Sequence, residues 1–148
     1  MGNNEEIFSK YSRILNTTLE GKSVLNYLTS HDDHHPFDKE RTRTLEAGTK
    51  LLLAPGAAQV YYGDESARNL NQEGAAGDAT LRGPMNWDEI GSGKEIQGIP
   101  VPEVLEHYQK LGTFRKNHPA VGAGVHQMIS REPYVFSRTY ASGTYSDL

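Results

Sequence analysis

The pattern of apolar and polar residues predicts an amphipathic helix at the start of the chain. Over residues 5–19, Ile7, Tyr11 and Ile14 recur at the three- and four-residue spacing of one helix face. Acidic residues occupy the first turn, where they interact favourably with the positive end of the helix dipole. We expect this helix to end before Gly21, because glycine is the residue that most often follows a helix.

Residues 24–62 have the pattern of a strand, a helix and a second strand. The short apolar run at residues 24–29 predicts a strand, and the polar stretch at residues 30–38 predicts a loop. Asp38 is placed to cap a helix over residues 39–54, and residues 57–62 predict the second strand. A helix that joins two strands through short connections returns the chain to the same edge, so the strands are expected to be parallel and the fold class α/β.

The second half of the chain is less periodic. Residues 63–100 are rich in glycine, and loops of this length usually serve a site, so we expect the segment to fold over the strand ends. Pro102 opens another amphipathic helix, which Pro119 ends. The remainder alternates glycine-rich turns with short segments such as residues 134–136, and predicts the start of a small β region.

Composition narrows the classes of partner. The 148 residues carry 15 Lys and Arg against 19 Asp and Glu, without a basic run, which disfavours nucleic acid and anionic lipid and favours a neutral or polar small molecule. Cysteine is absent, which excludes disulfides, thiolate metal sites and a thiol nucleophile. No run approaches the roughly 20 apolar residues of a membrane span, and the first residues lack the pattern of a signal peptide.

Two clusters of polar and aromatic residues follow the two predicted strands. Residues 30–35 read Ser-His-Asp-Asp-His-His, and residues 61–65 read Tyr-Tyr-Gly-Asp-Glu. Parallel α/β folds place ligands beyond the carboxyl ends of their strands, so both clusters are expected on one face. Aromatic rings beside carboxylates suit sugars, because rings pack on the C–H faces while carboxylates accept hydrogen bonds from hydroxyls.

The histidines of the first cluster also raise the alternative of a metal site. His31, Asp32, His34, His35 and Asp38 are all ligand types for zinc. Their spacing is not the i, i+4 pattern that presents two imidazoles from one helix face, so we predict no metal site and treat His34 and His35 as polar loop residues.

Four ordered motifs make the chain resemble a known family. Residues 27–32 resemble a signature region that usually ends in Asn-His-Asp, with Ser30 in place of the asparagine, and residues 55–65 resemble a barrel strand and its exit. Residues 82–87 and 114–120 resemble the following loop and the end of the last barrel helix. Together these motifs resemble glycoside hydrolase family 13, the α-amylase family.

The resemblance implies a fold and a domain organisation. Residues 1–119 would be the C-terminal portion of a (β/α)8 barrel, about strands 7 and 8 with their helices. Residues 120–148 would be the start of a C-terminal antiparallel β domain. Such a piece has unpaired strand edges, so its expected partner is another copy or the missing part of the barrel.

The resemblance also implies an activity on α-glucosidic bonds of starch, glycogen or malto-oligosaccharides, with a retaining mechanism in the parent enzyme. Asp32 would be the catalytic residue that stabilises the transition state, and His31, Asp64 and Tyr62 would bind the substrate. The nucleophile and the general acid belong to the fourth and fifth strands, which precede Met1, so this chain alone is expected to be inactive. No cofactor is expected in this segment, and a calcium ion of the parent would lie outside it. The family is often secreted or periplasmic, but the sequence leaves the localisation of this chain undetermined.

Several side chains have a structural alternative. Asp33 is expected to face away from the site, because adjacent residues of an extended chain face opposite sides, and to have a solvated or a loop-fixing role. Asp64 and Glu65 suit a turn after Gly63 as well as they suit a sugar, and Arg82 is expected to pair with one of these carboxylates. Trp87, like Tyr62, suits either a sugar platform or the core.

The sequence is also compatible with two other functional interpretations. The chain could be a noncatalytic amylase-like unit that binds sugar or another protein. Its parent could also be a glucanotransferase or an α-1,6-glucosidase, because the loops that select the acceptor and the linkage lie mostly outside this segment.

Overall fold

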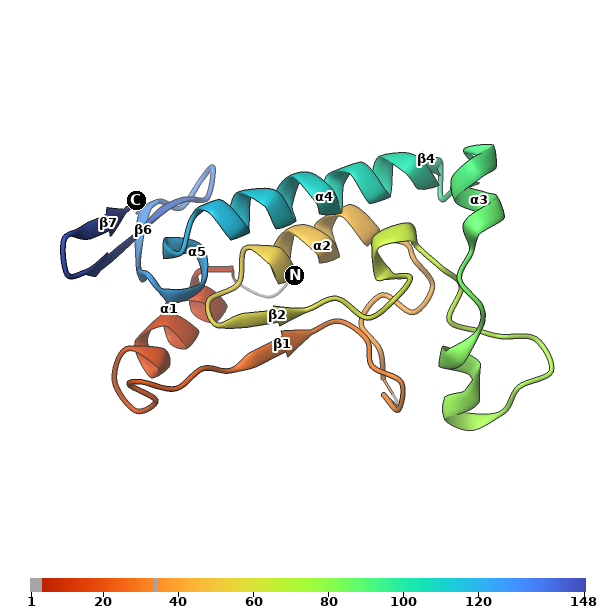
Figure 1. The fold of residues 1–148 in the computed structure, drawn as a ribbon, viewed down its shortest axis with the longest axis horizontal. Coiled ribbons are helices and arrows are strands. Elements are labelled where there is room, and N and C mark those ends of the chain that lie inside the picture. Colours follow the sequence, from red (N-terminus) through yellow and green to blue (C-terminus); the bar gives the residue numbers. More distant parts are fainter. Residues whose placement is uncertain (1–3, 34) are drawn as a thin grey trace. The chain divides into compact units, whose positions relative to one another are not determined.

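The structure is a computed structural model that describes residues 4–33 and 35–148 (Figure 1). The chain divides into two compact units, each built from separate stretches of sequence. The first unit comprises Met1–Asn26, Leu53–Ala58 and Thr113–Leu148, and the second comprises Tyr27–Leu52 and Gln59–Gly112. The expected domain boundary between residues 119 and 120 stays a prediction.

The first unit contains a helix packed on a small sheet. Helix α1 (Asn4–Leu15) contacts β5 (Val125–Ser130), which pairs antiparallel with β6 (Val135–Ser142), and β6 pairs antiparallel with β7 (Tyr145–Asp147). The short helix α5 (Ala120–Ala123) precedes the sheet. Phe8 and Ser12 are the buried residues of α1, and the Phe8 ring packs on that of Phe136 in the sheet. Ile7 and Tyr11, which the periodicity placed on the apolar face, are instead exposed. The helix ends at Leu15, four residues before the predicted end, and a series of turns leads to Gly21 at a φ of 73°.

The two strands predicted on either side of a helix are present but short. They are β1 (Leu25–Tyr27) and β2 (Ala57–Gln59), which form a two-stranded sheet and run in the same direction in Figure 1. The Asn26 amide donates to the carbonyls of Pro55 and Ala57, which ties the first strand to the start of the second. The described chain thus mixes helices and strands, and the α/β class and the (β/α)8 barrel stay predictions.

The helix between these strands begins later than predicted. Helix α2 spans Thr44–Leu52, whereas the sequence predicted residues 39–54. Asp38 does cap the chain, since its carboxylate accepts hydrogen bonds from the backbone N–H groups of Thr42 and Arg43 at 2.8 and 3.0 Å. The turn between Asp38 and the helix contains a positive φ at Arg41, which is incompatible with a helix that starts at residue 39.

Residues 63–100 are more regular than predicted. This segment contains two 3-10 helices, η1 (Asp64–Ser66) and η2 (Gly77–Arg82), the helix α3 (Trp87–Ser92) and a hairpin of β3 (Glu95–Ile96) and β4 (Ile99–Pro100). Helix α4 (Val101–Asn117) follows directly and stops before Pro119, as the sequence predicts.

The core of the second unit is apolar and encloses several charged groups. Leu70, Leu81, Val101 and Val104 are almost completely buried. Tyr108 packs closely on α2, where a Cβ at Gly48 would lie 2.5 Å from a ring carbon. Over the described part of the chain, no helix is long and apolar enough to cross a membrane.

Candidate functional site

The loop after β1 presents Asp32 at the surface. The carboxylate accepts a hydrogen bond from the hydroxyl of Ser30 at 2.9 Å, and Nε2 of His31 lies 3.6 Å from its second oxygen. The side chains of His31 and Asp32 are 66% and 60% exposed, so both are free to contact a ligand. The residue that departs from the Asn-His-Asp motif, Ser30, thus holds the carboxylate locally.

The neighbouring acidic residue fixes the same loop. One carboxylate oxygen of Asp33 accepts a hydrogen bond from the backbone N–H of His35 at 2.9 Å. The backbone N–H of Phe37 donates to the carbonyl of Leu28, which closes the base of the loop. The predicted loop-fixing role of Asp33 is therefore confirmed, whereas His34 lies outside the described residues.

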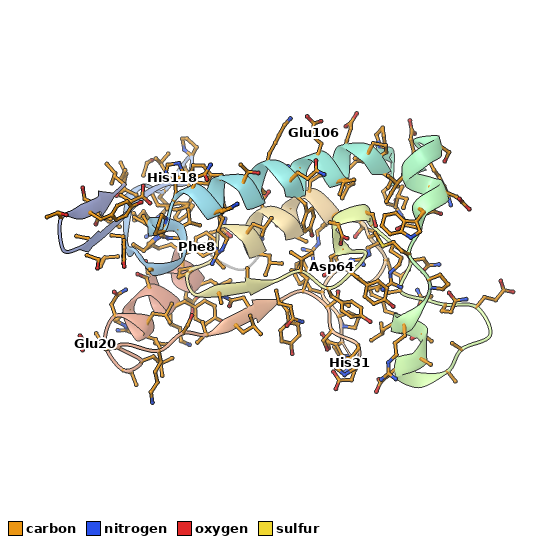
Figure 2. All side chains as sticks on the ribbon, viewed as in Figure 1. Phe8, Glu20, His31, Asp64, Glu106 and His118 are labelled. Atoms are coloured by element: carbon orange, nitrogen blue, oxygen red, sulfur yellow. The ribbon has the colours of Figure 1, made fainter. Side chains whose placement is uncertain are left out.

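Asp64 lies on the exit of β2 but does not reach the surface. Its side chain is fully buried, and Nη1 of Arg41 lies 2.9 Å from one carboxylate oxygen. Burial raises the pKa of Asp64, although Arg41 and Thr29 oppose this effect. Figure 2 shows Asp64 in the interior, whereas His31 lies in the loop beyond β1. Asp64 is thus placed as a structural residue, and its contact with a sugar stays a prediction.

Glu65 stabilises the turn that leads away from β2. Its carboxylate accepts a hydrogen bond from the backbone N–H of Gly63 at 2.8 Å. Gly63 has a φ of 91° and lies against the side chain of Arg68. A side chain at this position would strain the backbone and collide with Arg68, so the turn requires glycine.

Tyr62 carries a cation on its ring and remains partly exposed. The guanidinium of Arg68 lies 4.3 Å from the centre of the Tyr62 ring, and the Tyr62 hydroxyl donates to the carbonyl of Gly83 at 3.0 Å. Tyr62 is 41% exposed, which leaves part of the side chain accessible. Trp87, at the start of α3, is 70% exposed and therefore does not belong to the core.

Arg68 is a buried arginine that the sequence did not identify. It is 2% exposed and donates to the carbonyls of Tyr62, Leu81 and Gly83 at distances of 2.9 to 3.2 Å. This side chain fastens the end of η2 to the exit of β2. Arginine is suited to this role because its planar group presents five N–H donors.

Arg82 connects the end of η2 to the loop that carries Asp32. Its Nε donates to the carbonyl of His31 at 3.0 Å. The sequence predicted a pairing of Arg82 with a nearby carboxylate, and the hydrogen bond that the structure shows goes to a backbone carbonyl instead.

Hydrogen bonds therefore link three of the predicted site residues, whereas Asp64 is buried and paired with Arg41. His31 and Asp32 share one loop, and Tyr62 reaches that loop through Gly83 and Arg82. Among the described residues, no three His, Asp or Glu side chains converge as a metal ion would require.

An exposed carboxylate and imidazole at the end of a strand, near a partly exposed tyrosine, form the kind of polar and aromatic surface that binds sugars. The chain is 39% identical over 128 residues to the periplasmic alpha-amylase of Escherichia coli (strain K12). No model of a known protein family matches the chain.

The match covers 82% of this chain but 17% of the length of that amylase. A match of this extent leaves at most about 27 residues of the chain outside it, so residues 31–83 lie within it wherever it begins. The candidate site as a whole therefore falls in the amylase-like segment.

Proposed function

We propose that this chain is part of a glycoside hydrolase of family 13 that cleaves α-glucosidic bonds, and that Asp32 stabilises the transition state. The observation that carries the proposal is the exposed, locally held Asp32 at the end of β1, inside a segment that is 39% identical to an α-amylase. The four motifs that resemble the family support the same assignment.

The chemistry of the loop suits this role. An ionised carboxylate accepts strong hydrogen bonds from hydroxyls, and such bonds strengthen as positive charge develops on a sugar ring. Ser30 orients the carboxylate of Asp32 before any ligand arrives, which reduces the cost of reorganisation. His31 has a ring nitrogen on the same side and is available as a donor to the same sugar.

The remaining predicted residues contribute in different ways. Tyr62 offers a partly exposed side chain for a sugar, whereas Asp64 supports the site indirectly as the buried partner of Arg41. The nucleophile and general acid of a retaining mechanism would come from other parts of the parent protein.

A chimera tests the proposal. The segment of the E. coli periplasmic amylase that aligns with this chain would be replaced by the corresponding residues of the chain, and starch hydrolysis would be measured. We expect an active chimera in which Asp32→Asn lowers kcat by roughly 100-fold with a small change in KM, because the lost interaction strengthens in the transition state.

Asp33→Asn is the matched control, since it makes the same replacement of a carboxylate by an amide at the adjacent residue. This variant should keep kcat near that of the unmodified chimera, because Asp33 bonds the loop and not the site. A chimera that folds cooperatively but has no activity refutes the proposed function. An Asp32→Asn chimera with an unchanged kcat and a raised KM shows instead that Asp32 only binds substrate.

A further inference from the structure

We propose that Arg82 and Arg68 are positioning residues for Asp32, with Arg82 holding the loop and Arg68 holding Arg82. This inference rests on the proposed function, because it assigns the two arginines to the same site. Neither arginine is a catalytic residue, since neither contacts the carboxylate of Asp32 in the described structure.

The first step is the contact between Arg82 and the backbone beside Asp32. The carbonyl that accepts from Arg82 Nε belongs to His31, and it shares a planar peptide unit with the N–H of Asp32. A hydrogen bond to this oxygen therefore restrains the plane from which the Cα of Asp32 projects. The direction of the Asp32 side chain depends on that plane.

This contact joins the loop to a segment that is distant in sequence. Within residues 30–33 the other side-chain hydrogen bonds join Ser30 to Asp32 and Asp33 to His35, so they stay inside the loop. Among the described residues, Arg82 is the hydrogen-bond donor from a distant segment that reaches this part of the loop. Its loss would leave the position of Asp32 to local contacts alone.

The second step is that Arg68 fixes the backbone on both sides of Arg82. Its guanidinium donates to the carbonyl of Leu81 at 2.9 Å and to that of Gly83 at 3.2 Å. The hydroxyl of Tyr62 adds a third hydrogen bond, also to Gly83. A buried cation shared by two carbonyls costs free energy to displace, because each carbonyl would lose a charge-assisted hydrogen bond. Arg82 consequently projects from a fixed piece of backbone.

Hydrogen–deuterium exchange on the 148-residue chain tests the physical link without any need for activity. In Arg82→Ala, we expect the hydrogen-bonded amides of the loop, those of Asp32 and His35, to exchange roughly tenfold faster, as the loss of one charge-assisted hydrogen bond predicts. Arg82→Lys should recover part of the protection, because lysine keeps a donor. Lys94→Ala, which removes a surface cation paired with Glu89, should leave this exchange unchanged.

Kinetics in the amylase chimera test the positioning itself. Arg82→Ala should lower kcat roughly tenfold and change KM less than about twofold, since a displaced Asp32 weakens the transition state more than ground-state binding. Arg68→Gln should give the same split. The double variant should be no worse than the more affected single variant, because residues that act through one contact are not additive.

The outcomes separate this inference from the proposed function. An inactive but folded chimera refutes the function, while the exchange measurement still decides whether Arg82 restrains the loop. Unchanged exchange and unchanged kcat in Arg82→Ala overturn the positioning role, even if Asp32→Asn abolishes activity. Multiplicative losses in the double variant overturn the link between Arg68 and Arg82. If Arg68→Gln fails to fold, Arg82→Ala still tests the contact with the loop, because Arg82 is exposed.

Discussion

A buried histidine in the first unit predicts how the stability of this chain depends on pH. His126 on β5 has a fully buried side chain, and its two ring nitrogens have different partners. Nε of Arg138 donates to Nδ1 at 3.3 Å, whereas Nε2 lies 2.9 Å from the hydroxyl of Tyr134, which in turn donates to Glu5. Because arginine is always a donor, Nδ1 must accept, and the imidazole must be neutral with its proton on Nε2.

The sign and size of the effect follow from this arrangement. Burial, together with the positive charge of Arg138, lowers the pKa of His126 below its ordinary value of 6.5, although Glu5 partly opposes the shift. Below pH 6.5 the unfolded chain therefore binds a proton that the folded chain does not bind. The free energy of unfolding should be highest above pH 6.5 and fall as the pH decreases through that value. The slope for one proton reaches up to about 1.4 kcal/mol per pH unit.

Urea unfolding followed by circular dichroism, at several values between about pH 7.5 and 5.5, measures this slope. His126→Gln keeps a donor near the position of Nε2 but removes the titration, so its profile should be flatter than that of the unmodified chain. His118→Gln is the matched control, since His118 lies in the same unit and its partly exposed ring is paired with Asp147. Equal slopes in the unmodified chain and in His126→Gln would refute the assignment.

Three further predictions concern the second unit and the isolated chain. Arg41→Met should cost about 3–5 kcal/mol in urea unfolding, because it leaves the buried carboxylate of Asp64 unpaired, and adding Asp64→Leu should restore much of the loss. Gly48→Ala should lower the melting temperature, since the overpacking of about 1–3 kcal/mol against Tyr108 exceeds the roughly 1 kcal/mol gained in helix propensity. The 148-residue chain alone should not hydrolyse starch, and turnover at an ordinary amylase rate that Asp32→Ala abolishes would contradict this prediction. Light scattering should show self-association of the chain, because its strand edges are unpaired. A stable 16.4 kDa monomer would contradict this second expectation.

The sequence predicted the elements whose signals are local. Periodicity located helices α1, α2 and α4 and the strands β1 and β2, and proline marked the end of α4 correctly. The boundaries were less accurate where tertiary contacts decide them. Helix α2 begins at Thr44 and not at the predicted residue 39, because the backbone of Arg41 takes a positive φ before the helix. No pattern of apolar residues reports such a turn.

The burial of Arg41 and Arg68 was missed for a physical reason. Arg41 and Arg68 lie in polar or glycine-rich segments, where a charged side chain is ordinarily solvated. Their burial depends on partners that are distant in sequence, namely Asp64 for Arg41 and the carbonyls of Leu81 and Gly83 for Arg68. Local composition cannot indicate these pairings. A usable signal was the position of Arg68 just after the Gly63 turn, because that glycine allows the close approach of a large side chain.

Asp32 and Asp64 show why position after a strand is not enough to assign a role. Both aspartates follow a strand of the same two-stranded sheet, and the sequence treated both as candidates for a sugar contact. Asp32 is exposed and receives a hydrogen bond from a neutral hydroxyl, so its carboxylate keeps its capacity to bind a ligand. Asp64 is buried against a cation, so its charge is already neutralised and a sugar hydroxyl would have to displace Arg41. Asp64 therefore supports the exit of β2 through Arg41, whereas Asp32 stays exposed, as the proposed contact with a sugar requires. Arg82 is the contact through which the segment that follows β2 acts on the loop of Asp32.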